Sequence, residues 1–176
     1  MDVQRAAKSL AGFAGVSRRM QVRGVVDGVT VIDDFAHHPT KVRETVRAIR
    51  ARYARSHLVA VFEPRTNTSR RKIFQEVYAA SFPGADEVVV VPPFDIEKIP
   101  EAERFDSAAL VAALQHKDQR AVLHGNVDEV VADLSGRLGS DTVVLIMSNG
   151  AFDNIHEKLL SALRSRAIPH SPPGAQ

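Results

Sequence analysis

Short apolar runs alternate with amphipathic segments along most of this chain of 176 residues. The apolar runs, which predict strands, are residues 57–62, 87–91, 121–123 and 142–147, and the segments with helical spacing are residues 39–54, 69–80, 107–116, 127–138 and 154–167. A continuous apolar run such as Val88–Val91 is typical of a strand that helices cover on both faces. The alternation therefore predicts an α/β, Rossmann-like fold, with a mainly parallel sheet of about six strands and helices on both faces.

The first forty residues depart from this alternation. Asp27-Gly28 separates two strand-like runs, Met20–Val26 and Val29–Ile32, and this dipeptide favours the tight turn of an N-terminal antiparallel hairpin. Residues 2–14 have helical spacing but no strand of their own, so we expect residues 1–19 to be the end of a preceding domain and a linker helix. We expect the α/β domain to span residues 20–168, and residues 169–176, with three prolines, to form a disordered tail.

The composition excludes several classes of protein. The formal net charge of +2 is too small to indicate a nucleic-acid partner, and the absence of cysteine excludes disulfides and thiolate metal sites. No apolar run approaches the roughly 20 residues that cross a bilayer, and the N-terminus lacks the pattern of a signal peptide. The sequence therefore predicts a soluble, cytoplasmic protein with no membrane partner.

The strongest candidate site follows the second strand of the predicted hairpin. Two carboxylates and two imidazoles lie close together in the segment Val31-Ile32-Asp33-Asp34-Phe35-Ala36-His37-His38-Pro39-Thr40. Burying four ionisable groups in a core is costly, and the carboxyl end of a strand faces the ligand crevice in this fold class. One of the two aspartates has the alternative role of capping the following helix. Metal binding is not predicted, because adjacent histidine side chains point apart and no spaced partner is evident.

Two further strand ends carry polar residues that suit an anionic ligand. They are Phe62-Glu63-Pro64-Arg65-Thr66-Asn67-Thr68-Ser69-Arg70 and Met147-Ser148-Asn149-Gly150-Ala151-Phe152-Asp153-Asn154-Ile155-His156. Arg65 and Arg70 suit a carboxylate or a phosphate, and the helix after Gly150 offers backbone N–H groups to an anion. Solvated surface charge is the alternative for the two arginines, and a simple strand-to-helix turn for Gly150. The three segments together predict a crevice for a small, anionic, multiply functional ligand.

No motif in the chain cradles the phosphates of a nucleotide. Neither Gly-x-x-x-x-Gly-Lys-Ser/Thr nor Gly-x-Gly-x-x-Gly after the first strand occurs, and there is no serine nucleophile elbow or cysteine nucleophile. A self-contained ATPase or dehydrogenase is therefore not expected. If phosphoryl chemistry is involved, another domain must hold the nucleotide phosphates.

Together the three segments resemble the C-terminal domain of the Mur ligases, the ATP-dependent amino-acid and peptide ligases of peptidoglycan synthesis. The resemblance runs from Gly15-Val16-Ser17-Arg18-Arg19 to the helix after Asn149. The form Asp-Asp-x-x-His-His-Pro-Thr points to the branch that acts on UDP-N-acetylmuramate, and residues 62–68 and 147–152 look most like the murein peptide ligases. The L-alanine-adding ligases would be expected to show Phe-Gln-Pro-His-Arg-Tyr-Thr-Arg, and this chain departs from that pattern at Arg65, Asn67 and Ser69.

The resemblance implies roles for particular residues. Arg19 and Asp34 match the positions that reach the ribose or the phosphates of the nucleotide. The positions expected to face the incoming peptide, whose free carboxylates need donors, are His37, His38, Arg65, Asn67, Thr68, Arg70, Ser148 and Asn149. Asp153 and His156 are close to these in sequence but rank lower. No residue is assigned a catalytic or metal-ligating role, and ATP and Mg²⁺ are expected to be held mainly by the central domain of the complete enzyme.

The implied reaction is amide ligation through an acyl phosphate. In it the complete enzyme joins UDP-N-acetylmuramate to the murein tripeptide L-alanyl-γ-D-glutamyl-meso-diaminopimelate in peptidoglycan recycling. The N-terminal and central domains of such an enzyme would be the partners of this chain, which is not expected to catalyse alone. Two alternatives remain: the C-terminal domain of a UDP-N-acetylmuramate–L-alanine ligase, and a stand-alone, non-catalytic α/β module that binds a nucleotide or a peptide.

Overall fold

The computed structural model describes residue 4 and residues 16–167. Most of the helix expected at residues 2–14, and the tail expected at residues 169–176, therefore lie outside the described residues.

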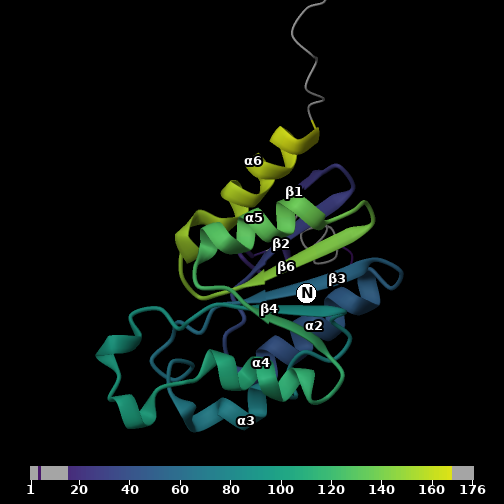
Figure 1. The fold of residues 1–176 in the computed structure, drawn as a ribbon. Coiled ribbons are helices and arrows are strands. Elements are labelled where there is room, and N and C mark those ends of the chain that lie inside the picture. The colour runs from purple at the N-terminus through teal and green to yellow at the C-terminus, as the bar shows by residue number, and fades with distance from the viewer. Residues whose placement is uncertain (1–3, 5–15, 168–176) are drawn as a thin grey trace, which may run out of the picture.

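Within residues 16–167 the chain forms a six-stranded sheet in the order β1-β2-β6-β3-β4-β5 (Figure 1). The strands are β1 Gln21–Val26, β2 Val29–Asp34, β3 His57–Phe62, β4 Glu87–Val90, β5 Arg120–Leu123 and β6 Thr142–Met147. The α-helices are α2 Pro39–Arg52, α3 Gln75–Tyr78, α4 Ser107–Gln115, α5 Val127–Arg137 and α6 Ile155–Ala167, and the 3₁₀ turns are η1 Lys72–Phe74, η2 Ile96–Lys98, η3 Glu101–Glu103 and η4 Phe152–Asn154.

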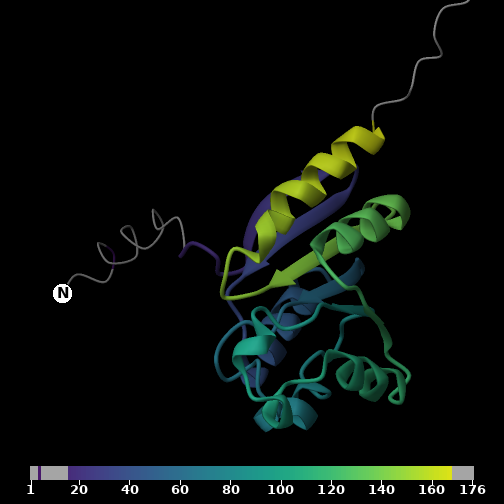
Figure 2. The same ribbon diagram turned by 60° about the vertical axis from the view of Figure 1, so that its left-hand side comes forward.

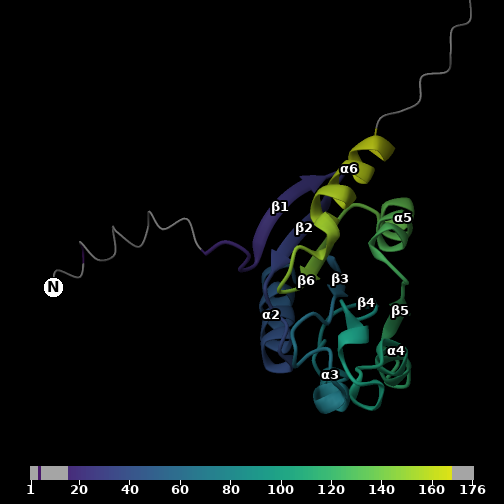
Figure 3. The same cartoon turned by 90° about the vertical axis from the view of Figure 1, so that its left-hand side faces the viewer.

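The sheet is covered by helices on both faces, as the alternation of the sequence predicts. Helices α2, α3 and α4 lie on one face and α5 and α6 on the other (Figures 1 and 3). Side chains alternate between the two faces along each strand. On β3, for example, Leu58, Ala60 and Phe62 enter the core under α2, α3 and α4, whereas Val59 and Val61 enter the core under α5 and α6. The predicted α/β fold is thus confirmed, including its mainly parallel sheet.

The hairpin at the start of the domain is also confirmed. β1 and β2 pair antiparallel across Asp27 and Gly28, whose φ angles of 51° and 74° lie in the left-handed region. Gly28 is required there, because a Cβ on it would lie 2.8 Å from the Cβ of Ser140. Helix α6 packs against β1 and β2, so the hairpin is fixed to the rest of the sheet (Figure 2).

One predicted helix is much shorter in the structure. The segment predicted as a helix from 69 to 80 contains only η1 and the single turn α3. Thr66 and Ser69 exchange hydrogen bonds, with the Ser69 N–H donating to Thr66 Oγ1 at 3.0 Å and the Thr66 N–H donating to Ser69 Oγ at 2.9 Å. Such side-chain bonds to the local backbone compete with helix formation. The segment after β3 is therefore a structured loop at the edge of the sheet.

The strand order places the three candidate segments next to one another. β6 lies between β2 and β3, and it pairs in parallel with both. Met147, the last residue of β6, is paired with Asp34 on one side and with Phe62 on the other. The segments after residues 34, 62 and 147 therefore leave the same edge of the sheet side by side, where ligands bind in open α/β sheets.

Candidate functional site

The two adjacent aspartates at the end of β2 point to opposite faces of the sheet. Asp33 follows Val31 toward α6, and Asp34 follows Ile32 toward α2, because side chains alternate along a strand. Both are almost fully buried, with 2% and 5% of their surface exposed. The structure therefore gives each carboxylate a separate set of partners.

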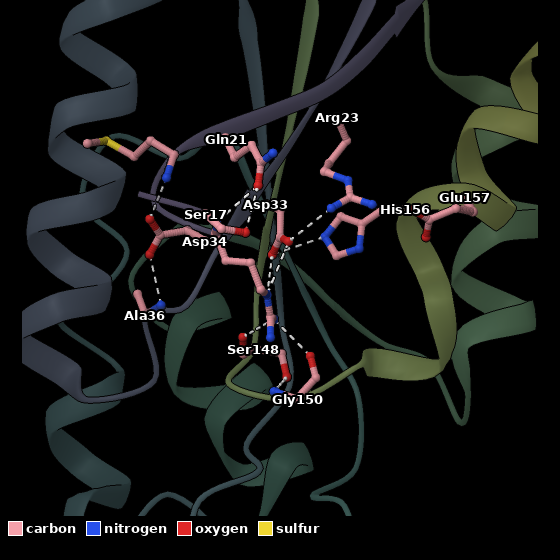
Figure 4. A network of polar contacts seen from close by, with 12 residues as sticks. Ser17, Gln21, Arg23, Asp33, Asp34, Ala36, Ser148, Gly150, His156 and Glu157 are labelled. Atoms are coloured by element: carbon pink, nitrogen blue, oxygen red, sulfur yellow. Dashed lines mark hydrogen bonds and ion pairs between the residues drawn. The ribbon is translucent and has the colours of Figure 1, made fainter. Parts of the chain in front are cut away.

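Asp33 lies in a cluster of positive and neutral donors drawn from three segments (Figure 4). Arg18 Nε is 3.2 Å from Asp33 Oδ2, and His156 Nε2 of α6 is 3.3 Å from Oδ1. The same guanidinium donates through Nη2 to the backbone oxygens of Ser148 at 2.7 Å and Gly150 at 2.8 Å. Arg18 thus joins the segment before β1 to the ends of β2 and β6.

The electrostatics of this cluster favour the ionised form of Asp33. Burial raises the pKa of Asp33, but the close approach of His156 and the charges of His156 and Arg18 outweigh it. The pKa therefore lies below its usual value. Asp33 binds its proton less tightly in the folded state than in the unfolded state, whose value is about 3.9. The stabilisation is thus present above that value and lost as the pH falls through the folded-state pKa.

We expect the free energy of unfolding to fall as the pH is lowered from about 5 to about 2, and to fall less in Asp33→Asn. Urea unfolding at several pH values measures this dependence. Asp118→Asn is the control, because Asp118 is exposed and its side chain has no hydrogen bond or ion pair among the described residues. An acid dependence that is equal in Asp33→Asn and the wild-type chain would contradict the assignment.

Asp34 holds the backbone on both sides of the strand end. Its Oδ2 accepts from the Met20 N–H at 2.8 Å, and its Oδ1 accepts from the Ala36 N–H at 2.8 Å and from Thr45 Oγ1 at 3.3 Å. A carboxylate has about four acceptor positions, so these three donors leave one position open by this count. Asp34 is therefore partly structural. It does not cap the following helix, as the sequence allowed for one of the pair, because the N-cap of α2 is His38 and no side chain bonds to that end of the helix.

A cavity of about 360 Å³ lies beside Asp34. Its lining residues come from the segment before β1, from the end of β2 and from α2, and they are Arg19, Met20, Asp34, Phe35, Ala36, His37, Lys41, Glu44, Thr45 and Ala48. Arg19 is exposed and Phe35 is 39% exposed. The cavity thus combines apolar surface with two cations, Arg19 and Lys41, and with two carboxylates, Asp34 and Glu44. Arg19 and Asp34, the two residues that the resemblance assigned to the nucleotide, thus line one cavity.

The two histidines occupy different surroundings. His37 lines the same cavity, and its Nδ1 is 2.9 Å from the backbone oxygen of Phe35. His38 is exposed, stands just before α2, and packs edge-on against Phe74 with 4.9 Å between ring centroids. The structure therefore places His37 in the cavity beside Asp34 and His38 beside Phe74, in the segment after β3. Among the described residues no group of three or more histidine, cysteine or acidic side chains could hold a metal ion.

A second buried carboxylate, Glu63, lies at the end of β3. Ser148 Oγ donates to Glu63 Oε2 at 2.5 Å, and Arg65 Nη1 lies 3.3 Å from Oε1. Burial raises the pKa of Glu63 above its usual value, and the Ser148 hydrogen bond and the charges of Arg65 and Arg18 offset only part of this rise. Ser148 and Arg65, both predicted site residues, are therefore brought together by a residue to which the sequence assigned no role.

The other predicted residues after β3 and β6 differ in how far they are free to bind a ligand. Asn67 and Thr68 are exposed, whereas Arg70 Nη1 donates to the backbone oxygens of Phe94 at 3.2 Å and Asp95 at 3.0 Å. Asn149 Oδ1 is buried and has no hydrogen-bond partner among the described residues. A buried acceptor without a protein partner suits a ligand that donates a hydrogen bond.

Arg18 and Glu63 are the residues that sequence reasoning missed. Arg18 stands next to Arg19, and nothing in the sequence shows that Arg18 bonds to the strand ends whereas Arg19 is exposed. A signal for Glu63 was present, because a carboxylate directly after the apolar run of β3 is as unusual as the aspartates at the end of β2.

In the described part of the chain no helix is long and apolar enough to span a membrane.

Comparison with known proteins identifies the class. Residues 18–150 match the family model described as Mur ligase, glutamate ligase domain. The chain therefore belongs to the Mur ligase family, and it corresponds to the C-terminal domain that the three strand-end motifs resemble.

Particular relatives include ligases with two different acceptors. The UDP-N-acetylmuramate–L-alanyl-γ-D-glutamyl-meso-2,6-diaminoheptandioate ligase of Escherichia coli (strain K12) is 36% identical over 163 residues, which are 92% of this chain and 34% of that protein. The UDP-N-acetylmuramate–L-alanine ligase of Roseiflexus sp. (strain RS-1) is 34% identical over 160 residues, 91% of this chain and 33% of that protein. This chain thus spans about a third of the length of the curated relatives it matches.

Solved structures agree with this placement. The crystal structure of a murein peptide ligase from Psychrobacter arcticus 273-4 superposes with a TM-score of 0.74 at 32% identity, and covers 93% of this chain and 33% of that one. A single domain from a Haemophilus ducreyi protein, described as a ligase of the same tripeptide type, gives a TM-score of 0.64 at 36% identity and covers 82% of this chain and 99% of its own. A related domain has therefore been crystallised by itself.

Proposed function

We propose that this chain is the C-terminal domain of an ATP-dependent ligase that joins UDP-N-acetylmuramate to the tripeptide L-alanyl-γ-D-glutamyl-meso-diaminopimelate. The observation that carries the proposal is the adjacency of three polar strand ends, in which Arg19 and Asp34 line one cavity and Arg65 and Ser148 both bond to Glu63. One side would face the nucleotide and the other the incoming peptide. ATP and Mg²⁺, held mainly by a central domain, would supply the activated acyl group.

The domain itself would contribute binding and orientation. Arg65, Asn67 and Thr68 after β3, and Asn149 after β6, offer donors and an acceptor at two adjacent strand ends, and free carboxylates of the peptide would need such donors. Holding the peptide amine in place beside the activated acyl group lowers the entropic part of the barrier. Closure of this domain over the nucleotide would keep water from the acyl phosphate. None of these contributions requires a nucleophile on this chain.

A tripeptide acceptor is favoured over L-alanine by the loop after β3. The pattern expected of the L-alanine-adding ligases has histidine and tyrosine where this chain has Arg65 and Asn67. L-alanine presents one carboxylate, whereas the tripeptide presents several, and the Arg65 guanidinium and the Asn67 amide would donate to carboxylates that L-alanine lacks. The relatives include both kinds of ligase, so the acceptor must be decided by experiment.

The deciding experiment compares two acceptors in a full-length ligase that contains this chain. ADP release is measured with ATP, Mg²⁺ and UDP-N-acetylmuramate, and with either the tripeptide or L-alanine. We expect release to depend on the tripeptide. Faster release with L-alanine would identify the other acceptor, and no release with either would contradict the proposed function.

Arg19→Ala tests the nucleotide side of the proposal. We expect the KM for ATP to rise about tenfold while the KM for the tripeptide stays within about twofold, because a lost charged hydrogen bond is worth roughly 1.5–3 kcal/mol. Arg19 suits this test better than Asp34, whose removal would also free the backbone of Met20 and Ala36. An unchanged KM for ATP would remove Arg19 from the nucleotide site.

A further inference from the structure

The side chain of Arg65 is enclosed by residues of two other segments, Phe94 and Gly150, and by Glu63 of its own segment. Its guanidinium carbon lies 3.6 Å from the centroid of the Phe94 ring, and its Nη1 lies 3.3 Å and 3.4 Å from the two oxygens of Glu63. Gly150 makes room for it, because a Cβ at residue 150 would lie 1.9 Å from Arg65 Nε and 2.5 Å from Cζ. We define the Arg65 slot as the space bounded by Phe94, Gly150 and Glu63.

Phe94 is not a core residue, and its position is held by the backbone. The ring is 42% exposed. The Phe94 N–H donates to the Pro64 oxygen at 3.1 Å, and the Phe94 and Asp95 oxygens both accept from Arg70 Nη1. An exposed aromatic side chain in a loop tied down at both of its peptide groups contributes little to the core, so its stacking on Arg65 needs another explanation.

The two edges of the Arg65 guanidinium differ in their protein partners. Glu63 takes Nη1 and is itself held by Ser148. Among the described residues, Arg65 Nε and Nη2 donate to no protein acceptor. A guanidinium edge with two parallel N–H groups matches the two oxygens of a carboxylate, and stacking on an aromatic face keeps the fork in one orientation.

We propose that Phe94 and Gly150 are positioning residues that hold this edge of Arg65 ready for one carboxylate of the acceptor peptide. Arg70 acts through Phe94 by holding its loop, rather than by direct contact with the peptide. The proposal rests on the proposed function for the role of Arg65, but the geometry of the slot does not. The two parts are therefore tested separately.

The geometry is tested by NMR on this 176-residue chain. A ring at this distance should shift the Hε resonance of Arg65 upfield. We expect Phe94→Ala and Gly150→Ala to abolish the shift and Phe94→Tyr to keep it. Gly150 does not have a positive φ, so alanine is compatible with its backbone, and the atoms it displaces belong to the flexible Arg65 side chain. An Hε resonance of Arg65 at its usual position in the wild-type chain would contradict the geometry of the slot, independently of the function of the protein.

The function is tested in the full-length ligase with matched variants. We expect Phe94→Ala and Gly150→Ala to raise the KM for the tripeptide about tenfold with the KM for ATP unchanged, and Phe94→Tyr to restore it to within about twofold. Leu123→Ala is the control, because Leu123 is 38% exposed and lies on β5, outside the site. Amidation of each peptide carboxylate in turn should yield one analogue on which the variants and wild type are equal.

The outcomes separate the two proposals. A wild-type enzyme that releases no ADP with the tripeptide contradicts the proposed function. An active wild-type enzyme whose KM for the tripeptide is the same in Phe94→Ala and Gly150→Ala contradicts the positioning role. Equal rises in the KM for ATP and for the tripeptide would also contradict it, because they indicate a general loss of structure.

Discussion

Replacing Arg18 with alanine is expected to lower the free energy of unfolding of this chain by about 3 kcal/mol, the lower end of the cost of breaking a buried ion pair. The substitution leaves Asp33, whose side chain is 3% exposed, without its closest guanidinium partner. It also removes the donors to the Ser148 and Gly150 oxygens. His156 and Arg23 remain near Asp33, at 3.3 Å and 3.9 Å, so the loss is partial.

The effect of Arg18→Ala is measured by thermal and urea unfolding of the isolated chain. A loss of about 3 kcal/mol corresponds to a fall in Tm of about 6–12 °C for a protein of this size. Arg19→Ala is the matched control, since it removes the same kind of side chain from the next position, where it is exposed. Its stability should change by less than about 0.5 kcal/mol. Equal losses in the two variants would contradict the role of Arg18 as the link between three segments.

Replacing Arg65 with alanine in the full-length ligase is expected to lower kcat/KM for the tripeptide about 100-fold. Two charged hydrogen bonds to one carboxylate would be lost, and Glu63 would lose its guanidinium partner. The larger part of the change should appear in the KM for the tripeptide. The KM for ATP should stay within about twofold, because Arg65 is not among the residues that line the cavity beside Asp34.

Two further variants show whether the guanidinium itself matters. Arg65→Lys keeps the charge but lacks the planar fork, so we expect it to recover only a small part of the activity. Arg55→Ala removes an exposed arginine just before β3, at the opposite edge of the sheet, and should leave both KM values unchanged. A lysine variant as active as the wild type would show that charge alone is required, and would contradict bidentate recognition.

The elements with the strongest apolar runs were predicted with their correct boundaries. The strands at residues 57–62 and 142–147 match β3 and β6, since turn-forming residues bound each run and burial on both faces demands a continuous apolar composition. Helix prediction was weaker after β3. Spacing alone suggested a helix of twelve residues from Ser69, but the hydrogen bonds between Thr66 and Ser69 form a loop where that helix was expected to begin. Local side-chain bonds of that kind leave no periodic signal.

The site was predicted as three separate segments, not as an arrangement. Each segment could be recognised because ionisable residues follow an apolar strand directly. Their adjacency depends on β6 entering the sheet between β2 and β3, although it is the last strand in the sequence. Strand order arises from long-range pairing, and no local pattern encodes it.

The sequence by itself determined the α/β class, the hairpin, and the family to which the chain belongs, because each of these depends on local composition and on short motifs. Only the tertiary structure decided which of two neighbouring residues does what. Asp33 and Asp34 take different partners because a strand turns successive side chains to opposite faces. Arg18 rather than Arg19 joins the strand ends because its side chain reaches Asp33 and two carbonyl oxygens that lie over a hundred positions further along the chain.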